Sequence, residues 1–212
     1  MEGVMNTVLL SADDENLTAA GLALKNGGIV AFPTDTVYGL GAIYRDEKAV
    51  AKIFEAKGRD EGKPLSILVS NIEQVELLAD LGSGRMYEKA LRLMKTYWPG
   101  ALTLIFKKKA GIPDNVTAGG ETIGIRMPDL DVTLKIIEAA GFPLAAPSAN
   151  TSGKRSSVLA QEVAEDLSGK IDMIIDGGAC KVGLASTVVD MTGEYPKILR
   201  EGVITQEMID QA

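Results

Sequence analysis

The chain has 212 residues, a formal net charge of −7, one cysteine and no histidine. The absent histidine excludes Ser-His-Asp and Cys-His triads, most catalytic zinc sites and imidazole acid–base chemistry. The single thiol, Cys180, excludes an internal disulfide and is in keeping with a reducing compartment. The acidic balance opposes nucleic-acid binding over the whole surface but leaves room for a local basic cleft.

The apolar fraction, 46% of residues, suffices for a sizeable core, and the length suits one domain over 1–212 with its core at about 14–202. No apolar run reaches the roughly 18–20 residues that a membrane span requires. The first residues, MEGVMNTVLLSADDEN, lack the basic and apolar stretches of a secretory signal. We therefore expect a cytoplasmic protein that does not enter the membrane.

Short apolar runs typical of strands alternate with helical periodicities along the chain. Helices are expected at 14–26, around 49–54 with an end at Gly58, at 71–78 with Asn71 and Gln74 as a capping box, at 86–97, 131–140 and 157–167 with Ser157 as cap, and from Thr205. Strands are expected at 28–32, 65–69, 101–107, 122–126, 143–147, 171–175, 186–190 and 196–199. This order and the hairpin-length connections predict an α/β (α+β) fold with a mixed sheet flanked by helices.

The first motif, PTDTVYGLG at 33–41, follows a predicted buried strand. Pro, Asp and Gly are typical of a tight turn, which is the structural interpretation. The functional one is a binding loop, because hydroxyls of Thr34, Thr36 and Tyr38 and small glycines at a strand end leave room for a ligand.

Cations form the second group. Lys57, Arg59 and the nearby Lys63 are either a solvated helix end or a phosphate clamp, since Arg provides a planar fork and Lys a mobile point charge. Arg126 ends the apolar strand TIGIR, where an unpaired guanidinium is costly. It needs an anion from the protein or from a substrate carboxylate, and we favour the substrate.

A third motif, AAPSANTSG at 145–153, leads into Lys154, Arg155 and Ser156. It is either a polar turn or a nest of small hydroxyls and backbone amides that holds phosphate. The chain contains neither a Walker A loop nor a G-x-G-x-x-G fingerprint. The last motifs, STVVD and LREG, which contain Ser186 and Arg200, are by themselves an ordinary strand pair.

Taken in order, the motifs are specific. The chain resembles the YrdC/TsaC family of L-threonylcarbamoyladenylate synthases from about Gly28 to Gly202, in the motifs PTDTVYGLG, KGR with KPL, WPGALT, GIRMP, APSAN with SG, STVVD and LREG. The extra C-terminal domain of longer members has no counterpart in the 212 residues. The resemblance implies a twisted mixed sheet with a concave, positively charged cleft.

The resemblance also implies a reaction. ATP, L-threonine and bicarbonate would become threonylcarbamoyl-AMP and pyrophosphate, with Mg²⁺ accompanying ATP and no metal held by the protein. The product would supply a separate tRNA threonylcarbamoyl transferase complex that makes tRNA N6-threonylcarbamoyladenosine. Such a transfer needs cations and positioning more than a protein nucleophile, so a site without histidine suits it.

The family pattern implies roles for particular residues. Threonine and bicarbonate would contact Thr34, Thr36, Tyr38, Arg126, Ala146 and Ser186. ATP would contact Arg59, Lys63, Thr122, Ser148, Asn150, Ser156 and Arg200, with Lys57 and Arg59 as the catalytic cations. The chain departs from many longer members at Leu68, where they have histidine, and at Ala185, where they have glutamate.

Two alternatives stay open. One is a non-catalytic module of the same fold that binds double-stranded RNA or tRNA, for which salt-dependent RNA binding without ATP turnover is the expected sign. The other is a sugar-phosphate lyase on a similar fold, which the lack of histidine disfavours.

Overall fold

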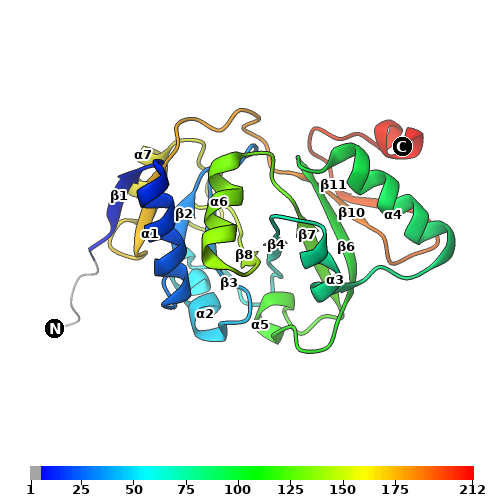
Figure 1. Cartoon of the computed structure of the whole chain (residues 1–212), viewed down its shortest axis with the longest axis horizontal. Helices are drawn as coiled ribbons and strands as arrows, with labels where there is room; N and C mark the ends of the chain where they lie inside the picture. Colours follow the sequence, from blue (N-terminus) through cyan, green and yellow to red (C-terminus); the bar gives the residue numbers. More distant parts are fainter. Residues whose placement is uncertain (1–5) are drawn as a thin grey trace.

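The computed structural model describes residues 6–212 and contains one hydrogen-bonded sheet with helices on both of its faces (Figure 1). Its strands are β1 (Val8–Ser11), β2 (Val30–Phe32), β3 (Gly39–Ile43), β4 (Ser66–Leu68), β5 (Ala79–Asp80), β6 (Leu102–Lys108), β7 (Thr122–Arg126), β8 (Leu144–Ala145), β9 (Met173–Asp176), β10 (Thr187–Asp190) and β11 (Lys197–Arg200). Its helices are α1 (Asp14–Lys25), α2 (Glu47–Lys57), α3 (Glu73–Leu78), α4 (Gly84–Tyr97), α5 (Asp114–Thr117), α6 (Asp131–Ala140), α7 (Ala160–Leu167) and α8 (Gln206–Gln211).

The sheet is mixed, as predicted. Its strand order is β1-β9-β2-β3-β8-β4-β7-β6-β10-β11, and β5 pairs with β6 beside this path. The pairs β1–β9, β2–β9, β4–β7 and β6–β10 are parallel, whereas the other neighbours are antiparallel. Neighbouring strands often come from distant parts of the chain, so the sheet brings motifs together that are far apart in sequence.

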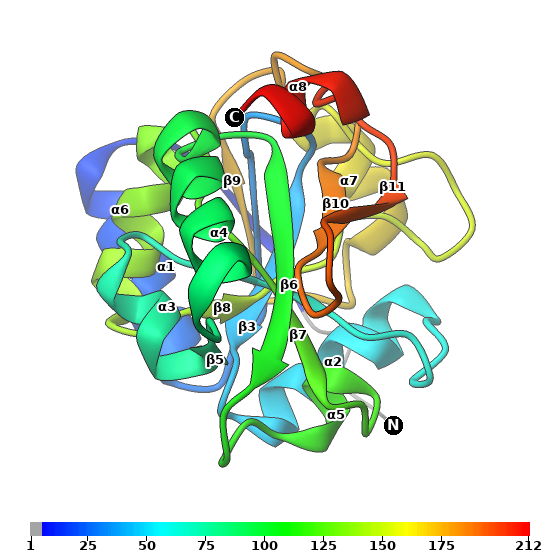
Figure 2. The ribbon, with the colours of Figure 1, turned by 90° about the vertical axis from the view of Figure 1, so that its right-hand side faces the viewer.

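Both faces of the sheet are covered. Figure 2 shows α1, α6 and α4 on one side of β6 and α7 on the other. Because alternate strand residues point to opposite faces, Val30 and Phe32 pack in the apolar cluster with α1 and α6, while Ala31 packs in the second cluster. Gly21 lets α1 and α6 approach closely, since a Cβ built there would lie 2.4 Å from the Cβ of Ala139. A strand buried on both faces explains the uninterrupted apolar run of β2.

Most predicted elements are present within a few residues of their expected bounds. Helix α6 and strand β7 have the predicted bounds, and α1 buries Leu17, Ala20, Gly21 and Leu24 as predicted. Helix α2 ends at Gly58, whose left-handed φ of 56° suits a residue without a side chain. Within residues 6–212, no helix has both the length and the apolar character needed to cross a bilayer.

Four elements are absent from the predictions: β1, β3, β5 and α5. Strand β3 contains two glycines, which are typical of turns, yet the aromatic ring of Phe32 leaves no space for a side chain at Gly41. Strand β1 is largely exposed and is defined by its parallel pairing with distant β9. Pairing across the chain therefore determines these strands more than local propensity does.

Two predicted caps differ in detail. Ser157 does not cap α7, because its hydroxyl donates to the carbonyl of Ala149 over 3.0 Å and the helix begins three residues later. Asn71 accepts from the backbone N–H of Gln74 as expected, but the Gln74 side chain accepts from Ser70 instead of Asn71. The Ser157 hydroxyl and the Gln74 amide are thus each hydrogen-bonded to a backbone group other than the predicted one.

Candidate active site

A cleft of about 190 Å³ opens where several strand ends and loops meet. Polar side chains and turn backbone dominate its wall, and three of its residues are arginines. It is lined by Thr34, Thr36, Val37, Tyr38, Gly39, Arg59, Pro64, Leu65, Ser66, Leu68, Thr103, Arg126, Ala146, Pro147, Ser148, Ser156, Ala185, Ser186 and Arg200.

The cleft brings together most of the residues singled out in the sequence. Ten of them line it: Thr34, Thr36, Tyr38, Arg59, Arg126, Ala146, Ser148, Ser156, Ser186 and Arg200. Four others do not: Lys57, Lys63, Thr122 and Asn150. Leu68 and Ala185, the two positions that depart from longer family members, both lie in the wall.

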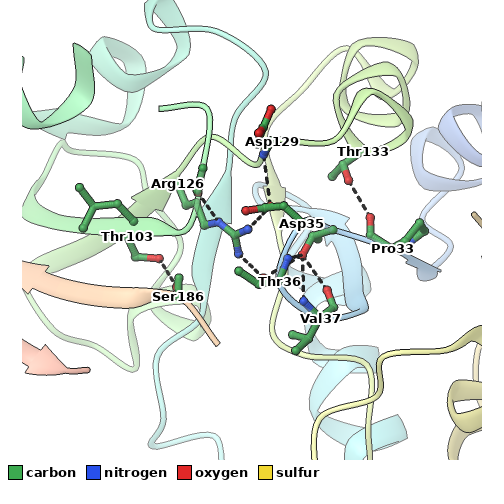
Figure 3. A network of polar contacts seen from close by, with 12 residues as sticks. Pro33, Asp35, Thr36, Val37, Thr103, Arg126, Asp129, Thr133 and Ser186 are labelled. Carbon is green, nitrogen blue, oxygen red and sulfur yellow. Dashed lines mark hydrogen bonds and ion pairs between the residues drawn. The ribbon is translucent and has the colours of Figure 1, made fainter. Parts of the chain in front are cut away.

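Arg126, at the end of β7, is buried and held by three acceptors (Figure 3). Its Nε donates to the carbonyl of Gly100 over 2.9 Å, its Nη1 donates to Thr36 Oγ1 over 2.8 Å, and its Nη2 pairs with the carboxylate of Asp35. Burial lowers the pKa of Arg126 and the adjacent Asp35 opposes that effect, so the guanidinium stays charged.

Asp35 corrects the expected pairing of Arg126. The sequence interpretation leaves the protein and a substrate open as the source of its counter-charge and favours the substrate, whereas in the structure the protein itself provides a carboxylate. Asp35 does not line the cleft, and it also accepts from the backbone N–H of Asp129 over 3.2 Å. The charge of Arg126 is therefore already balanced by Asp35, which lies outside the cleft lining. The N–H groups of Arg126 that have no protein acceptor are left for a ligand.

The two threonines of the first motif differ in the hydrogen bonds of their hydroxyls. The Thr34 hydroxyl donates to the carbonyl of Val37 over 2.7 Å and accepts from the backbone N–H of Thr36 over 3.1 Å. The Thr36 hydroxyl lies 2.9 Å from that of Thr34 and must be its donor, because the proton of Thr34 is already used. Thr34 thus shapes the loop, whereas Thr36 joins Arg126 at the cleft.

Tyr38 is fully buried and ties the same loop to a distant one. Its hydroxyl donates to the carbonyl of Gly178 over 2.8 Å, and the backbone N–H groups of Val182 and Gly183 donate to Asp35 and Thr36. Burial raises the pKa of Tyr38, so its phenol stays neutral. The hydroxyl therefore positions a loop and is not free for a ligand.

Lys57 lies behind the cleft wall, although the sequence predicts a catalytic cation. It is the last residue of α2, and its buried ammonium donates to the carbonyls of Ser148 and Asn150. Its own carbonyl accepts from Ser152 N–H over 2.8 Å. Burial, and then repulsion from Arg59, lowers the pKa of Lys57 to about 8. Lys57 braces the turn of the third motif from beneath.

The remaining predicted phosphate contacts surround that turn. Asn150 is buried and its amide N–H donates to the carbonyls of Thr151 and Lys154, so it also stabilises the turn. Arg59 lines the cleft with one bond, from Nη2 to the carbonyl of Pro64, and its buried Nε has no partner within the described chain. Lys63 and Thr122 are exposed outside the wall. Arg59 is therefore the least satisfied cation of the cleft.

Ser186 and Arg200 line the cleft as a hydrogen-bonded pair. Arg200 donates from Nε and Nη2 to the carbonyl of Ser186 over 3.0 and 2.9 Å, and from Nη2 to its hydroxyl over 3.1 Å. Burial lowers the pKa of Arg200. Thr103 Oγ lies 2.7 Å from the Ser186 hydroxyl in the cleft. Thr103 was missed, although a hydroxyl inside the apolar run ALTLIF is a signal for it.

Within residues 6–212, no group of three or more His, Cys, Asp or Glu residues is arranged to hold a metal ion. The polar side chains that line the cleft carry guanidinium and hydroxyl groups. The lining of the cleft includes three arginines and no carboxylate, and Asp35 pairs with Arg126 behind it, so the local charge is positive in a chain of net charge −7. Such a surface attracts anions and concentrates them.

Fold and cleft together define an α/β protein with an arginine- and hydroxyl-lined pocket on a mixed sheet. The model of the Sua5–YciO–YrdC family, described as telomere recombination, matches residues 22–202. The chain belongs to this family.

Three known proteins illustrate the similarity. The threonylcarbamoyl-AMP synthase of Bacillus subtilis is 48% identical over 95% of this chain and 57% of its own length. The Pyrococcus abyssi Sua5 structure complexed with L-threonine matches with a TM-score of 0.90 and 44% identity, over 98% of this chain and 60% of that one. The Escherichia coli YciO structure matches with a TM-score of 0.80 and 25% identity, over 94% of this chain and 95% of that one. The chain thus spans little more than half the length of the first curated relatives, which are covered to 57% and 55%.

Proposed function

We propose that this protein is a nucleotidyltransferase that makes L-threonylcarbamoyl-AMP and pyrophosphate from L-threonine, bicarbonate and ATP. The observation that carries the proposal is the convergence of Arg59, Arg126 and Arg200 with hydroxyls in one cleft. The name of the Bacillus subtilis relative supports it. We further propose that 1–212 form one catalytic domain, with its core at about 14–202.

The corner around Arg126 suits the amino-acid substrate. The free N–H groups of Arg126 would bind the threonine carboxylate, and the Thr36 and Ser186 hydroxyls would bind its polar groups. Thr34, Tyr38 and Ala146 would shape this corner through the loop that they hold or line. The structure of Pyrococcus abyssi Sua5 complexed with L-threonine supports an amino-acid substrate.

The other walls suit ATP. Arg59, Arg200, Ser148 and Ser156 would contact its phosphates, while Lys57 and Asn150 would hold the turn that presents Ser148. Lys63 and Thr122, which are exposed, would act only at the rim. Mg²⁺ would arrive bound to the phosphates of ATP and to water, because it keeps much of its hydration shell.

The chemistry needs no protein nucleophile. The threonine amine would attack bicarbonate to give the carbamate and water, and a carbamate oxygen would then attack the α-phosphorus. The bond to the β-phosphate oxygen breaks and the electron pair leaves with pyrophosphate. The arginines would stabilise the charge that develops on the phosphates, which is the main form of catalysis in phosphoryl and nucleotidyl transfer.

The product would pass to a tRNA threonylcarbamoyl transferase complex for N6-threonylcarbamoyladenosine formation in the cytoplasm. Direct contact of this chain with tRNA is a further part of the proposal, which the net charge of −7 restricts to a local basic surface.

Pyrophosphate release tests the function. ATP is supplied with threonine alone, bicarbonate alone, or both, and release is expected only with both. Lys135→Ala is the matched control variant, because Lys135 is an exposed cation paired with Asp14 on α1, outside the cleft. Pyrophosphate release that does not depend on threonine would contradict the proposal. Salt-dependent RNA binding without any ATP turnover would favour the RNA-binding alternative.

A further inference from the structure

Thr187, the first residue of β10, is fully buried and does not line the cleft. Its hydroxyl accepts from the backbone N–H groups of Gly202 and Ile204, each over 3.0 Å. The same hydroxyl donates to the carbonyl of Ile204 over 2.8 Å. A hydroxyl has one proton and two lone pairs, so all of its capacity is spent on this segment.

The segment that Thr187 holds follows directly on Arg200. The pairing of β10 with β11 extends to the pair Val188–Arg200, after a register shift between Val189 and Val188. Beyond that pair the Thr187 hydroxyl supplies three hydrogen bonds between the two chain segments. Only Glu201 separates Arg200 from Gly202, and adjacent Cα atoms are 3.8 Å apart, so a shift at Gly202 is passed to Arg200.

Close packing supports the same attachment. A Cβ built on Gly202 would lie 2.6 Å from the carbonyl oxygen of Ala185 and 2.6 Å from the backbone nitrogen of Thr187. Backbone thus lies directly against backbone at this point, and Ile204 is buried beside it. The segment 202–204 has one well-defined position on β10.

The guanidinium of Arg200 is oriented from the neighbouring residue. Nε and Nη2 donate to Ser186, which precedes Thr187 in sequence. Nη1 has no hydrogen-bond partner within residues 6–212, and Arg200 lines the cleft. The backbone of Arg200 is therefore tied through Thr187 and its side chain through Ser186, which leaves Nη1 for a ligand.

We propose that Thr187 is a positioning residue, which aims Arg200 at the phosphates of the nucleotide without touching them. The proposal rests on the proposed function, in which Arg200 binds ATP. Losing the hydroxyl frees the segment 202–204, and Arg200 then loses the fixed geometry that a directed phosphate contact from Nη1 requires. Binding of ATP weakens, whereas the corner around Arg126 is untouched.

The test measures KM and kcat for both substrates in the pyrophosphate-release assay. Thr187→Val keeps the shape and removes the three hydrogen bonds, and it is expected to raise the KM for ATP about tenfold or more with the KM for threonine within about twofold. Thr187→Ser, which keeps the hydroxyl, is expected to restore the KM for ATP to within about threefold.

Thr7→Val is the matched control. The Thr7 hydroxyl also donates to one backbone carbonyl and accepts from one backbone N–H, those of Ile171 and Gly169, beside strand β1 at the opposite end of the strand order. The variant Thr7→Val should lower the melting temperature without changing the KM for ATP or the KM for threonine. Equal changes in both KM values for Thr187→Val, or a changed melting temperature alone, would overturn the positioning role. If Thr187→Val does not fold, Thr187→Cys replaces it, since a thiol is a much weaker donor and acceptor.

A double-mutant cycle separates this inference from the proposed function. If Thr187 acts through Arg200, the combined Thr187→Val and Arg200→Ala variant is expected to have nearly the KM for ATP of Arg200→Ala alone. Additive effects would refute the coupling. If Arg200→Ala leaves the KM for ATP unchanged, the assignment of Arg200 to ATP fails instead.

Discussion

Two corners of the cleft differ in how many protein acceptors their arginine has. The Arg126 corner, made of Asp35, Thr36, Gly100 and Arg126, is buried, and its guanidinium already has three protein acceptors. The Arg59 corner has a guanidinium with one protein bond and a buried Nε without a partner in the described chain. The first corner is nearly neutral and rigid, and the second keeps positive charge and free donors. A single carboxylate suits the first, and a polyphosphate suits the second.

The largest expected effect breaks the Arg126 corner. Arg126→Met leaves Asp35 buried without its partner, so we expect the free energy of unfolding to fall by about 3–5 kcal/mol. The measurement is urea denaturation. Adding Asp35→Asn should recover part of the loss, because the unpaired charge is then removed. Equal stability of Arg126→Met and wild type would show that the pair contributes nothing.

The second largest effect is expected in the Arg59 corner. Arg59→Ala removes a guanidinium with a single protein bond, so we expect little change in melting temperature. The kcat/KM for ATP should fall tenfold or more, since one charge-assisted bond contributes about 1.5–3 kcal/mol. Steady-state kinetics with a thermal melt checks both values, with Lys135→Ala as control. A large stability loss with unchanged kinetics would reverse the assignment of the two corners.

The smallest effect concerns the turn beside Arg59. Because the pKa of Lys57 is lowered to about 8 from 10.5, the unfolded chain binds more protons at this residue between those pH values. Its contribution to the free energy of unfolding should therefore rise from pH 8 to pH 10.5. Urea denaturation of wild type and Lys57→Met across that range checks this. A difference between them that is flat with pH would mean that the pKa of Lys57 is not lowered.

Local signals in the sequence predicted most of the fold. Helical periodicity and Gly58 located α2, and the apolar run GIVAF located β2. Strand β3 was missed because its glycines are typical of turns, while the reason for them, the ring of Phe32 against Gly41, lies across the sheet. Such contacts leave no trace in a local window.

The candidate site was predicted less completely for the same reason. Residue type singled out Arg59 and Arg126, and the family resemblance added Ser186; all three line the cleft. Asp35 was overlooked as the partner of Arg126, since 91 positions separate them. Lys57 has the local pattern of a solvated helix end, and only the folded chain shows its ammonium beneath the turn at Ser148.

The strand order has a consequence for how the cleft comes into existence. Its walls come from the loops after β2, α2 and β8, from β4 and β6, from the ends of β7 and β11, and from the loop before β10, and the strand order of the sheet brings these segments together. No contiguous fragment of the chain holds all of them, and contacts between distant residues slow folding. Only a chain whose sheet is fully formed therefore binds the ligand. A bound ligand should protect the whole sheet from proteolysis as one cooperative unit.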